Sequence, residues 1–183
     1  MSPAPSMVRL TITLSDEDRS IWTELALVTA VHPSETEEFL AARCLAWCLR
    51  WEEGIQLSNG VSDTDEPAVS VRTMDGQLAA WIEVGLPDPD RLHKAAKRAP
   101  RVAVFPHRGT AQWRERCRAF RVHKAGSIEV VEFDPEFLTW VAGTMTGRSR
   151  WDLWVSAGEV RIAIDGQERA TTPRVSALDA PAE

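Results

Sequence analysis

Residues 80–97 read AWIEVGLPDPDRLHKAAK. An apolar strand ends near Gly85, and a cationic helix follows at once with Pro89 in its first turn. One carboxylate, Glu83, lies inside the strand. Burying an unpaired carboxylate costs several kcal/mol, so we expect a cation or a metal beside it. Glu83 is therefore the first candidate for a functional residue.

The bulk composition is that of a globular protein: 183 residues, 44% hydrophobic and 26% charged. We expect a single domain over residues 8–170, a flexible tail over residues 1–7 and a disordered tail over residues 171–183. No apolar run approaches the roughly 18 residues of a membrane helix, and no signal peptide is recognisable. Three cysteines, an odd number, favour reduced thiols packed in a core. These features predict a cytoplasmic monomer without a membrane partner.

The charge is unevenly distributed along the chain. The net charge is −6, yet the stretch from Arg91 to Lys124 holds eleven Lys or Arg against one acid, Glu115. Such a stretch predicts a basic surface on an acidic body, which suits a polyanionic ligand such as nucleic acid. The alternative is that part of the stretch is the solvated face of two helices.

Apolar periodicity and turn residues place the elements. A capping box of Ser34 with Glu37 begins a helix that should run to about residue 51. The Met74-Asp75-Gly76 turn indicates a hairpin of residues 67–72 and 77–85. The remaining strands are expected at residues 8–14, 21–31, 54–57, 101–105 and 128–133, with a hairpin over 151–164, and the remaining helices at residues 88–99, 110–120 and 135–142.

The order of these elements indicates the fold class. From residue 34 to residue 105 it is helix, strand, strand, strand, helix, strand. This order is typical of an α/β fold, a mixed β-sheet with flanking helices, here with additional strands at the N- and C-terminal sides.

The register of the predicted hairpin brings acidic residues together. With Val69 opposite Ile82, Glu66 becomes a diagonal neighbour of Glu83, within reach of one shared cation. A bulge before the strand would bring Asp65 to the site instead. Both alternatives remain open at this stage.

The helix after Ser34 adds a third acid. Glu38 lies at the top of its core-facing stripe, although a position at the solvent rim explains it equally well. Converging carboxylates repel each other unless a hard cation joins them, and oxygen ligands of this kind suit Mg²⁺ or Mn²⁺. Lys94 would supply the ammonium that stabilises charge on a phosphoryl group, unless it merely solvates its helix.

Four blocks of sequence carry a family resemblance. HPSETEE at residues 32–38, DEPA at 65–68, WIEVGLPD at 81–88 and RLHKA at 91–95 resemble the signature blocks of the YaeQ family. The resemblance implies a compact variant of the PD-(D/E)XK nuclease-like fold, with an αβββαβ core and a magnesium-dependent nuclease site. Two departures stand out, because the proline follows Asp65-Glu66 and because Gly85 occupies the usual place of the lysine. Lys94 on the next helix is then the matching cation.

Three functions follow from these observations. In the first, a metal-dependent nuclease or phosphodiesterase, the metal ligands are Glu83 with Asp65 or Glu66, supported by Glu38, and Lys94 meets the phosphate. The second is a non-catalytic module that binds nucleic acid or protein through the basic stretch. In the third, the acids only form structural ion pairs with Lys94.

The tryptophans carry a separate prediction. The chain has eight tryptophans and no tyrosine. Trp47, Trp81, Trp151 and Trp154 are expected in the core by their positions, and the alternative is that one or two tryptophans stack on bases.

Overall fold

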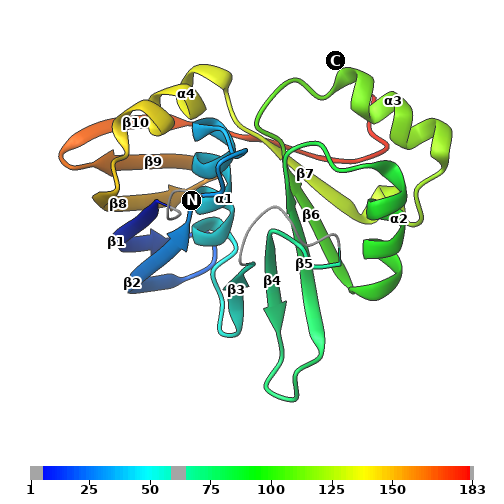
Figure 1. Ribbon diagram of the computed structural model, residues 1–183, viewed down its shortest axis with the longest axis horizontal. Helices are drawn as coiled ribbons and strands as arrows, with labels where there is room; N and C mark the ends of the chain where they lie inside the picture. The colour runs from blue at the N-terminus through cyan, green and yellow to red at the C-terminus, as the bar shows by residue number, and fades with distance from the viewer. Residues whose placement is uncertain (1–5, 59–64, 182–183) are drawn as a thin grey trace, which may run out of the picture. The chain divides into compact units, whose positions relative to one another are not determined.

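The protein is α/β, with two mixed sheets and four α-helices over the described residues 6–58 and 65–181 of a computed structural model (Figure 1). The chain divides into two compact units. Unit 1 contains the described residues up to Ala41 together with Phe133–Pro173. Unit 2 contains Ala42–Ser58, residues 65–132 and the chain from Arg174 onward.

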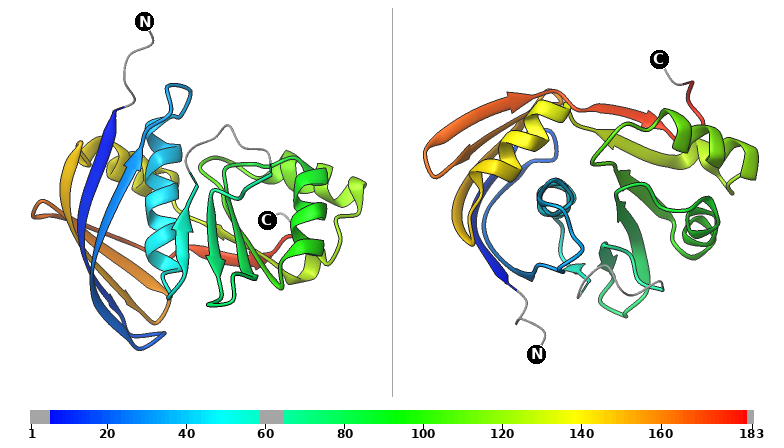
Figure 2. Two further views of the ribbon diagram at one scale, coloured as in Figure 1. Left: turned by 60° about the horizontal axis from the view of Figure 1, so that its bottom comes forward. Right: turned by 45° about the horizontal axis from the view of Figure 1, so that its top comes forward.

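Unit 1 is built on a five-stranded sheet of order β10-β9-β8-β1-β2. Its strands are β1 (Met7–Asp16), β2 (Ile21–Ala30), β8 (Arg148–Ser156), β9 (Glu159–Ile164) and β10 (Gln167–Thr171), and α4 (Pro135–Thr144) accompanies them. The sheet is visibly curved (Figure 2). Its strands alternate between buried apolar and exposed residues, with Leu14, Leu153 and Ile162 fully buried. One face of the sheet is therefore core and the other faces solvent.

Helix α1 (Glu37–Leu49) crosses the boundary between the two units and is buried from Leu40 to Cys48. Its cap differs from the prediction. Thr36 Oγ1 accepts the N–H of Phe39 at 3.2 Å, as an N-cap side chain does, whereas Ser34 contacts His32 Nδ1. The predicted capping box of Ser34 and Glu37 is therefore wrong, and the N-cap lies two residues later, at Thr36.

Unit 2 is built on a six-stranded sheet of order β11-β7-β6-β5-β4-β3. Its strands are β3 (Ile55–Leu57), β4 (Val69–Arg72), β5 (Leu78–Val84), β6 (Arg101–Phe105), β7 (Ile128–Glu132) and β11 (Arg174–Ala177). Helices α2 (Pro89–Arg98) and α3 (Ala111–Phe120) lie on the same side of this sheet (Figure 1). Trp81, Leu92, Val104, Trp113 and Cys117 are central to the core between them.

The predicted register of the β4–β5 hairpin is confirmed. Val69 pairs with Ile82 and Val71 pairs with Ala80. The predicted order of helix, strand, strand, strand, helix, strand is also present, as α1, β3, β4, β5, α2 and β6. The α/β class is thus confirmed, although the strands form two sheets where the sequence predicted one.

The C-terminal residues correct a prediction. A disordered tail was expected over residues 171–183, but β11 pairs antiparallel with β7, with Val175 opposite Val131. The buried Arg114 side chain holds this strand, because its guanidinium donates to the main-chain oxygens of Ala177 and Leu178 and to Ser176 Oγ. Because one buried arginine holds this edge strand, its sequence has little of the apolar alternation that indicates a strand.

The three cysteines, Cys44, Cys48 and Cys117, are free and buried, as predicted. Burial raises the pKa of the Cys117 thiol to about 11, so this thiol stays protonated at neutral pH. Within residues 6–58 and 65–181, no helix is both long and apolar enough to cross a membrane.

Candidate functional site

The first candidate residue, Glu83, lies in the centre of unit 2. It belongs to β5, an interior strand of the six-stranded sheet, and is 4% exposed. Alternation along the strand directs Glu83 and Trp81 to the face that carries α2, while Ile82 faces the other way. The expectation of a buried carboxylate in an apolar strand is confirmed.

Two side chains surround the Glu83 carboxylate. Trp81 Nε1 donates to Oε1 at 2.6 Å, and Arg91 Nε donates to the same oxygen at 2.5 Å. Arg91 comes from the first turn of α2 and is 23% exposed. The cation expected beside Glu83 is therefore a guanidinium from the following helix.

The protonated form of Glu83 is more favourable in this site than it would be in bulk water. Burial raises the pKa of Glu83 above its ordinary value, and the charge of Arg91 and the hydrogen bonds from Trp81 and Arg91 act in the opposite direction without cancelling it. Glu83 is thus a carboxylate whose ionised form depends on its two partners.

Arg91 also connects Glu83 to the predicted acidic segment. Its Nη2 donates to the main-chain oxygen of Glu66 at 2.5 Å, and Arg98 Nη1 lies 3.4 Å from the main-chain oxygen of Asp65. Both guanidinium groups lie over the Trp81 ring, at 5.7 and 5.3 Å from its centroid. The segment is brought to the site by its main chain, while the residues Asp65 and Glu66 themselves are exposed.

Lys94 lies apart from this arrangement. Its ammonium pairs with Asp90 at 2.6 Å, one helical turn earlier, and 67% of its side chain is exposed. The reason is the helix face, because Leu92, Ala95 and Ala96 point into the core. Arg91, at the edge of that buried face, takes the position that the sequence assigned to Lys94.

Glu38 belongs to unit 1, whereas the other four predicted site residues belong to unit 2. It is half-buried in the first turn of α1. Over residues 6–58 and 65–181, no three His, Cys, Asp or Glu side chains lie close enough together to hold a metal ion. The Glu83 carboxylate is already neutralised by Arg91, so this donor set does not fit Mg²⁺ or Mn²⁺.

A second cluster lies where the end of α3 meets α2. The His93 ring packs edge-on against Phe120, with centroids 5.7 Å apart, and its Nδ1 accepts the N–H of His123 at 3.2 Å. Phe120 nevertheless remains 46% exposed. Lys97 follows His93 by one helical turn. Arg121 and Lys124 follow Phe120 and His123 directly.

The cations around this cluster have no acidic partner among the residues that the structure describes. Lys97, Arg121 and Lys124 are exposed and form no ion pair with any described residue. Two further exposed cations of the same stretch, Arg108 and Arg116, likewise have no ion pair within the described residues. We call Lys97, Arg121 and Lys124 with the His93–Phe120–His123 contact the α2–α3 basic surface.

The backbone under this surface is unusual. Arg121 and Lys124 have φ values of 58° and 50°, a left-handed conformation that suits glycine and costs other residues roughly 1 kcal/mol. Arg121 is the C-cap of α3, a place where glycine is the common choice. Long cationic side chains therefore occupy two positions at which the fold alone favours glycine.

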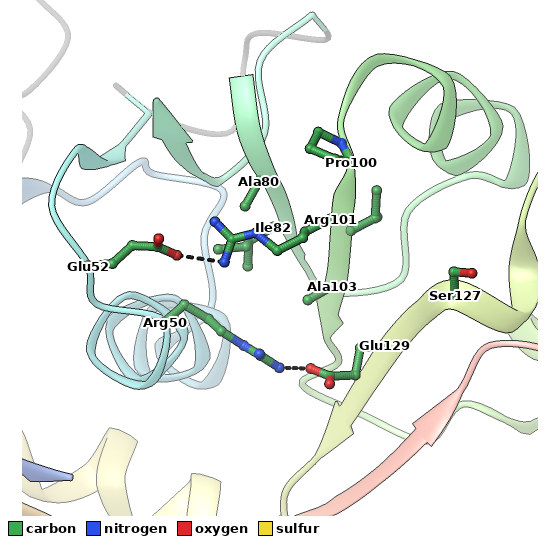
Figure 3. Close-up of a pocket in the computed structure, with 10 residues that line it drawn as sticks. Arg50, Glu52, Ala80, Ile82, Pro100, Arg101, Ala103, Ser127 and Glu129 are labelled. Atoms are coloured by element: carbon green, nitrogen blue, oxygen red, sulfur yellow. Dashed lines mark hydrogen bonds and ion pairs between the residues drawn. The ribbon is translucent and has the colours of Figure 1, made fainter. Parts of the chain in front are cut away.

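A pocket of about 170 Å³ lies on the other face of the unit 2 sheet (Figure 3). Its floor includes Ile82 and Ala103. Figure 3 shows Arg50 directed toward Glu129, and Arg101 toward Glu52. The charged side chains of the pocket thus neutralise each other in two ion pairs, which leaves no net charge to attract an ionic ligand.

Comparison with known proteins adds the family to this geometry. The model of the YaeQ protein family matches residues 1–173. The chain belongs to the YaeQ family. The resemblance of the four sequence blocks is thereby confirmed.

Relatives of the family come from several bacteria. Uncharacterized protein YaeQ of Salmonella typhi is 34% identical over 126 residues, which cover 66% of this chain and 70% of that protein. The protein of the same description from Escherichia coli strain K12 is 35% identical over 111 residues, which cover 61% of each chain. The family membership assigns no activity.

Two solved structures of the family share the fold. The crystal structure of the YaeQ protein from Pseudomonas syringae aligns with a TM-score of 0.88 at 27% identity, covering 96% of this chain and 97% of that one. The YaeQ protein from Xanthomonas axonopodis pv. citri aligns with a TM-score of 0.86 at 29% identity, covering 94% and 98%.

Two features of the site went undetected in the sequence. Arg91 was counted in the basic stretch and in the RLHKA block but was given no role, although its spacing of four from the buried Ala95 could have placed it at the edge of the core-facing stripe. The contact between His93 and Phe120 joins residues far apart in the sequence, and no local pattern indicates it.

Proposed function

We propose that this protein binds nucleic acid through the α2–α3 basic surface, and that the Glu83–Arg91 pair holds α2 in position beneath that surface. Phosphate contacts supply most of the affinity for nucleic acid, and they require cations that are not already paired. Lys97, Arg121 and Lys124 meet that requirement.

The observation that carries the proposal is the contact of His93, Phe120 and His123, with a cation adjacent in sequence or one helical turn away from each. An exposed aromatic ring with cations near it in the sequence suits single-stranded nucleic acid, since bases stack on rings and phosphates contact cations. Two cations in left-handed backbone conformations support the same reading, because strain of this kind concentrates at functional sites.

The test is binding of a fluorescently labelled oligonucleotide in the presence of EDTA, followed by anisotropy. The double variant Arg121→Gly with Lys124→Gly should weaken binding roughly tenfold, since each contact removed takes away a released counterion. The same variant should be at least as stable as the native protein, because glycine relieves the left-handed strain at both positions.

A matched control removes the same charge elsewhere in unit 2. Arg72 and Arg101 are exposed, but Arg72 donates to Gly76 O and Arg101 pairs with Glu52. Their double substitution to glutamine should leave binding within about twofold of the native protein. Equal weakening by both double variants, or no binding by the native protein, would refute the proposed function.

A second candidate function is a magnesium-dependent phosphodiesterase on a PD-(D/E)XK-like core. Arg91 joins the Glu83 carboxylate to the Glu66 main chain, so two of the predicted acidic segments lie close together, but this arginine would have to leave Glu83 before a metal could bind there. This candidate requires saturable binding of Mg²⁺ or Mn²⁺ that Glu83→Gln abolishes, and metal-dependent cleavage of mixed nucleic acids. Calorimetric titration with Mn²⁺ separates the two candidates, because the first predicts no heat of metal binding.

A further inference from the structure

The solvent face of the unit 1 sheet carries two exposed tryptophans in a single row. Trp22 on β2 is 64% exposed and Trp154 on β8 is 40% exposed. Both residues pair with the same residue of the strand between them, Ser15 of β1. Residues paired across neighbouring strands point to the same face, so the two indoles stand on either side of a small side chain.

The spacing of the strands sets the room between the indoles. Neighbouring strands lie about 4.8 Å apart, so the backbones of Trp22 and Trp154 are about 9.6 Å apart. Side chains stand roughly perpendicular to a sheet, and Ser15 is too short to fill the space between two tryptophans. We call this row the Trp22–Ser15–Trp154 slot, because the strand spacing leaves room for one inserted side chain between the two indoles.

These two indoles differ from other tryptophans of the chain. Guanidinium groups lie over the faces of Trp81 and Trp140, the latter under Arg169 at 5.5 Å from the ring centroid. Trp22 and Trp154 have no such cation within the described part of the chain. Two large apolar side chains thus remain partly exposed without a recorded cation over either ring, and exposed apolar patches often mark interaction sites.

The charges around the slot select the kind of ligand. Glu24 follows Trp22 by two residues on β2 and lies on the same face. It forms no ion pair within the described residues. Arg161 pairs in register with Trp154, but its guanidinium is bonded to Glu159 and Glu168.

Unit 1 as a whole has more acidic than basic residues. It contains thirteen Asp and Glu against six Lys and Arg. The outward register of the sheet also carries Arg9, Arg148 and Arg150, and Arg150 pairs with Asp152, so Glu24 is a charge beside the slot that has no ion pair among the described residues. Such a carboxylate beside two aromatic rings attracts a cation, and tryptophan is the best of the aromatic residues for binding a cation through its ring face.

We propose that the Trp22–Ser15–Trp154 slot binds a cationic side chain of a protein partner, an arginine or lysine presented by an extended basic segment. The alkyl stem packs between the indoles, and the charged group lies over a ring face with Glu24 close by. This inference concerns unit 1 and is independent of nucleic-acid binding by the α2–α3 basic surface in unit 2.

The test uses the full chain and a short peptide of alternating arginine and glycine as the probe, with binding measured by calorimetry. The native protein should bind the peptide, and Trp22→Ala and Trp154→Ala should each weaken binding about tenfold. Trp22→Phe should restore most of the affinity, since phenylalanine still offers a ring face. Glu24→Gln should weaken binding about threefold.

A matched control removes an exposed apolar side chain elsewhere. Met74 is 99% exposed at the β4–β5 turn of unit 2, so Met74→Ala should leave peptide binding unchanged. Trp22 and Trp154 are both exposed, so their substitution leaves the core intact, and far-ultraviolet circular dichroism confirms folding of each variant.

Four results would overturn the inference. The first is that the native protein does not bind the arginine peptide. The second is that it binds the peptide equally well with and without both tryptophans, which would indicate unspecific attraction to acidic residues. The third is tryptophan-dependent binding of a glutamate–glycine peptide or an oligonucleotide in place of the arginine peptide. The fourth is self-association that depends on Trp22 in analytical ultracentrifugation, which would make a second copy the occupant.

Discussion

Removal of the Arg91 side chain tests the energetic role of the buried pair. Arg91→Ala leaves Glu83, which is 4% exposed, with the Trp81 N–H as its remaining hydrogen-bond donor. Breaking a buried ion pair by removing one partner typically costs about 3–5 kcal/mol, because an uncompensated charge stays buried. The variant also loses the bond to the main chain of Glu66. We expect a loss of about 3–5 kcal/mol in the free energy of unfolding at pH 8.

The loss should depend on pH with a definite sign. The pKa of Glu83 is raised in the folded protein, so the folded state binds the proton more tightly than the unfolded state does. The contribution of Glu83 to the free energy of unfolding is therefore greatest at pH values below its ordinary pKa. It falls as the pH rises through the pKa that Glu83 has in the folded protein. Arg91 lowers the pKa of Glu83, so Arg91→Ala raises it further and moves this fall to higher pH. The cost of the substitution should thus be largest at pH 8 and much smaller at pH 5.

Urea denaturation at both pH values, followed by tryptophan fluorescence, measures these free energies. Glu83→Gln in the Arg91→Ala background should recover most of the lost stability at pH 8, since no charge is then buried. Arg101→Ala is the control, because its exposed pair with Glu52 should contribute under about 1 kcal/mol. A cost for Arg91→Ala under about 1 kcal/mol, or one of equal size at both pH values, would refute the reasoning.

Two further predictions concern single positions in unit 2. Lys94→Ala should change the unfolding free energy by less than about 0.5 kcal/mol, because its pair with Asp90 is largely exposed; a loss of several kcal/mol in urea titration would show a buried role. Gly54→Ala should be far more destabilising than Gly76→Ala, as measured by the midpoint of thermal unfolding. Both glycines have positive φ, which costs alanine about 1 kcal/mol, but a Cβ at Gly54 would lie 2.0 Å from the main-chain oxygen of Arg72 while one at Gly76 meets nothing within 4 Å. Equal midpoints for the two variants would contradict the close approach of the chain at Gly54.

Local patterns in the sequence sufficed for the hairpin. The alternation of apolar residues and the Asp75-Gly76 turn together fix the register of β4 and β5, because a shift by one residue would move every side chain to the other face. The pairing of Val69 with Ile82 follows from this constraint alone.

Pairing between distant strands was beyond the local signals. Strand β1 pairs in parallel with β8, for example Ile12 with Trp151. These two strands therefore belong to the five-stranded sheet and not to the six-stranded one. The apolar periodicity of a strand does not indicate which other strand it pairs with. Strand β10 was missed for a different reason, because its sequence QERAT is exposed and polar and has no apolar alternation.

The candidate site was predictable in part. The apolar surroundings of Glu83 indicated its burial and its need for a cation, and both are present. The sequence pointed to Lys94 as the cation near Glu83 through the spacing of a family motif, whereas the buried face of α2 places Arg91 there and Lys94 beside Asp90. Trp154, which the sequence placed in the core, is 40% exposed because it lies in the outward register of β8.

The salt dependence of oligonucleotide binding in EDTA reports the number of phosphate contacts that the protein makes without a metal. Each phosphate contact on a single strand contributes about 0.7 to the slope of log K against log salt concentration. The triple variant Lys97→Gln, Arg121→Gly and Lys124→Gly should therefore lower the magnitude of that slope by about 2. An unchanged slope, or binding by the native protein that appears only when Mg²⁺ is added, would contradict nucleic-acid recognition by the α2–α3 basic surface.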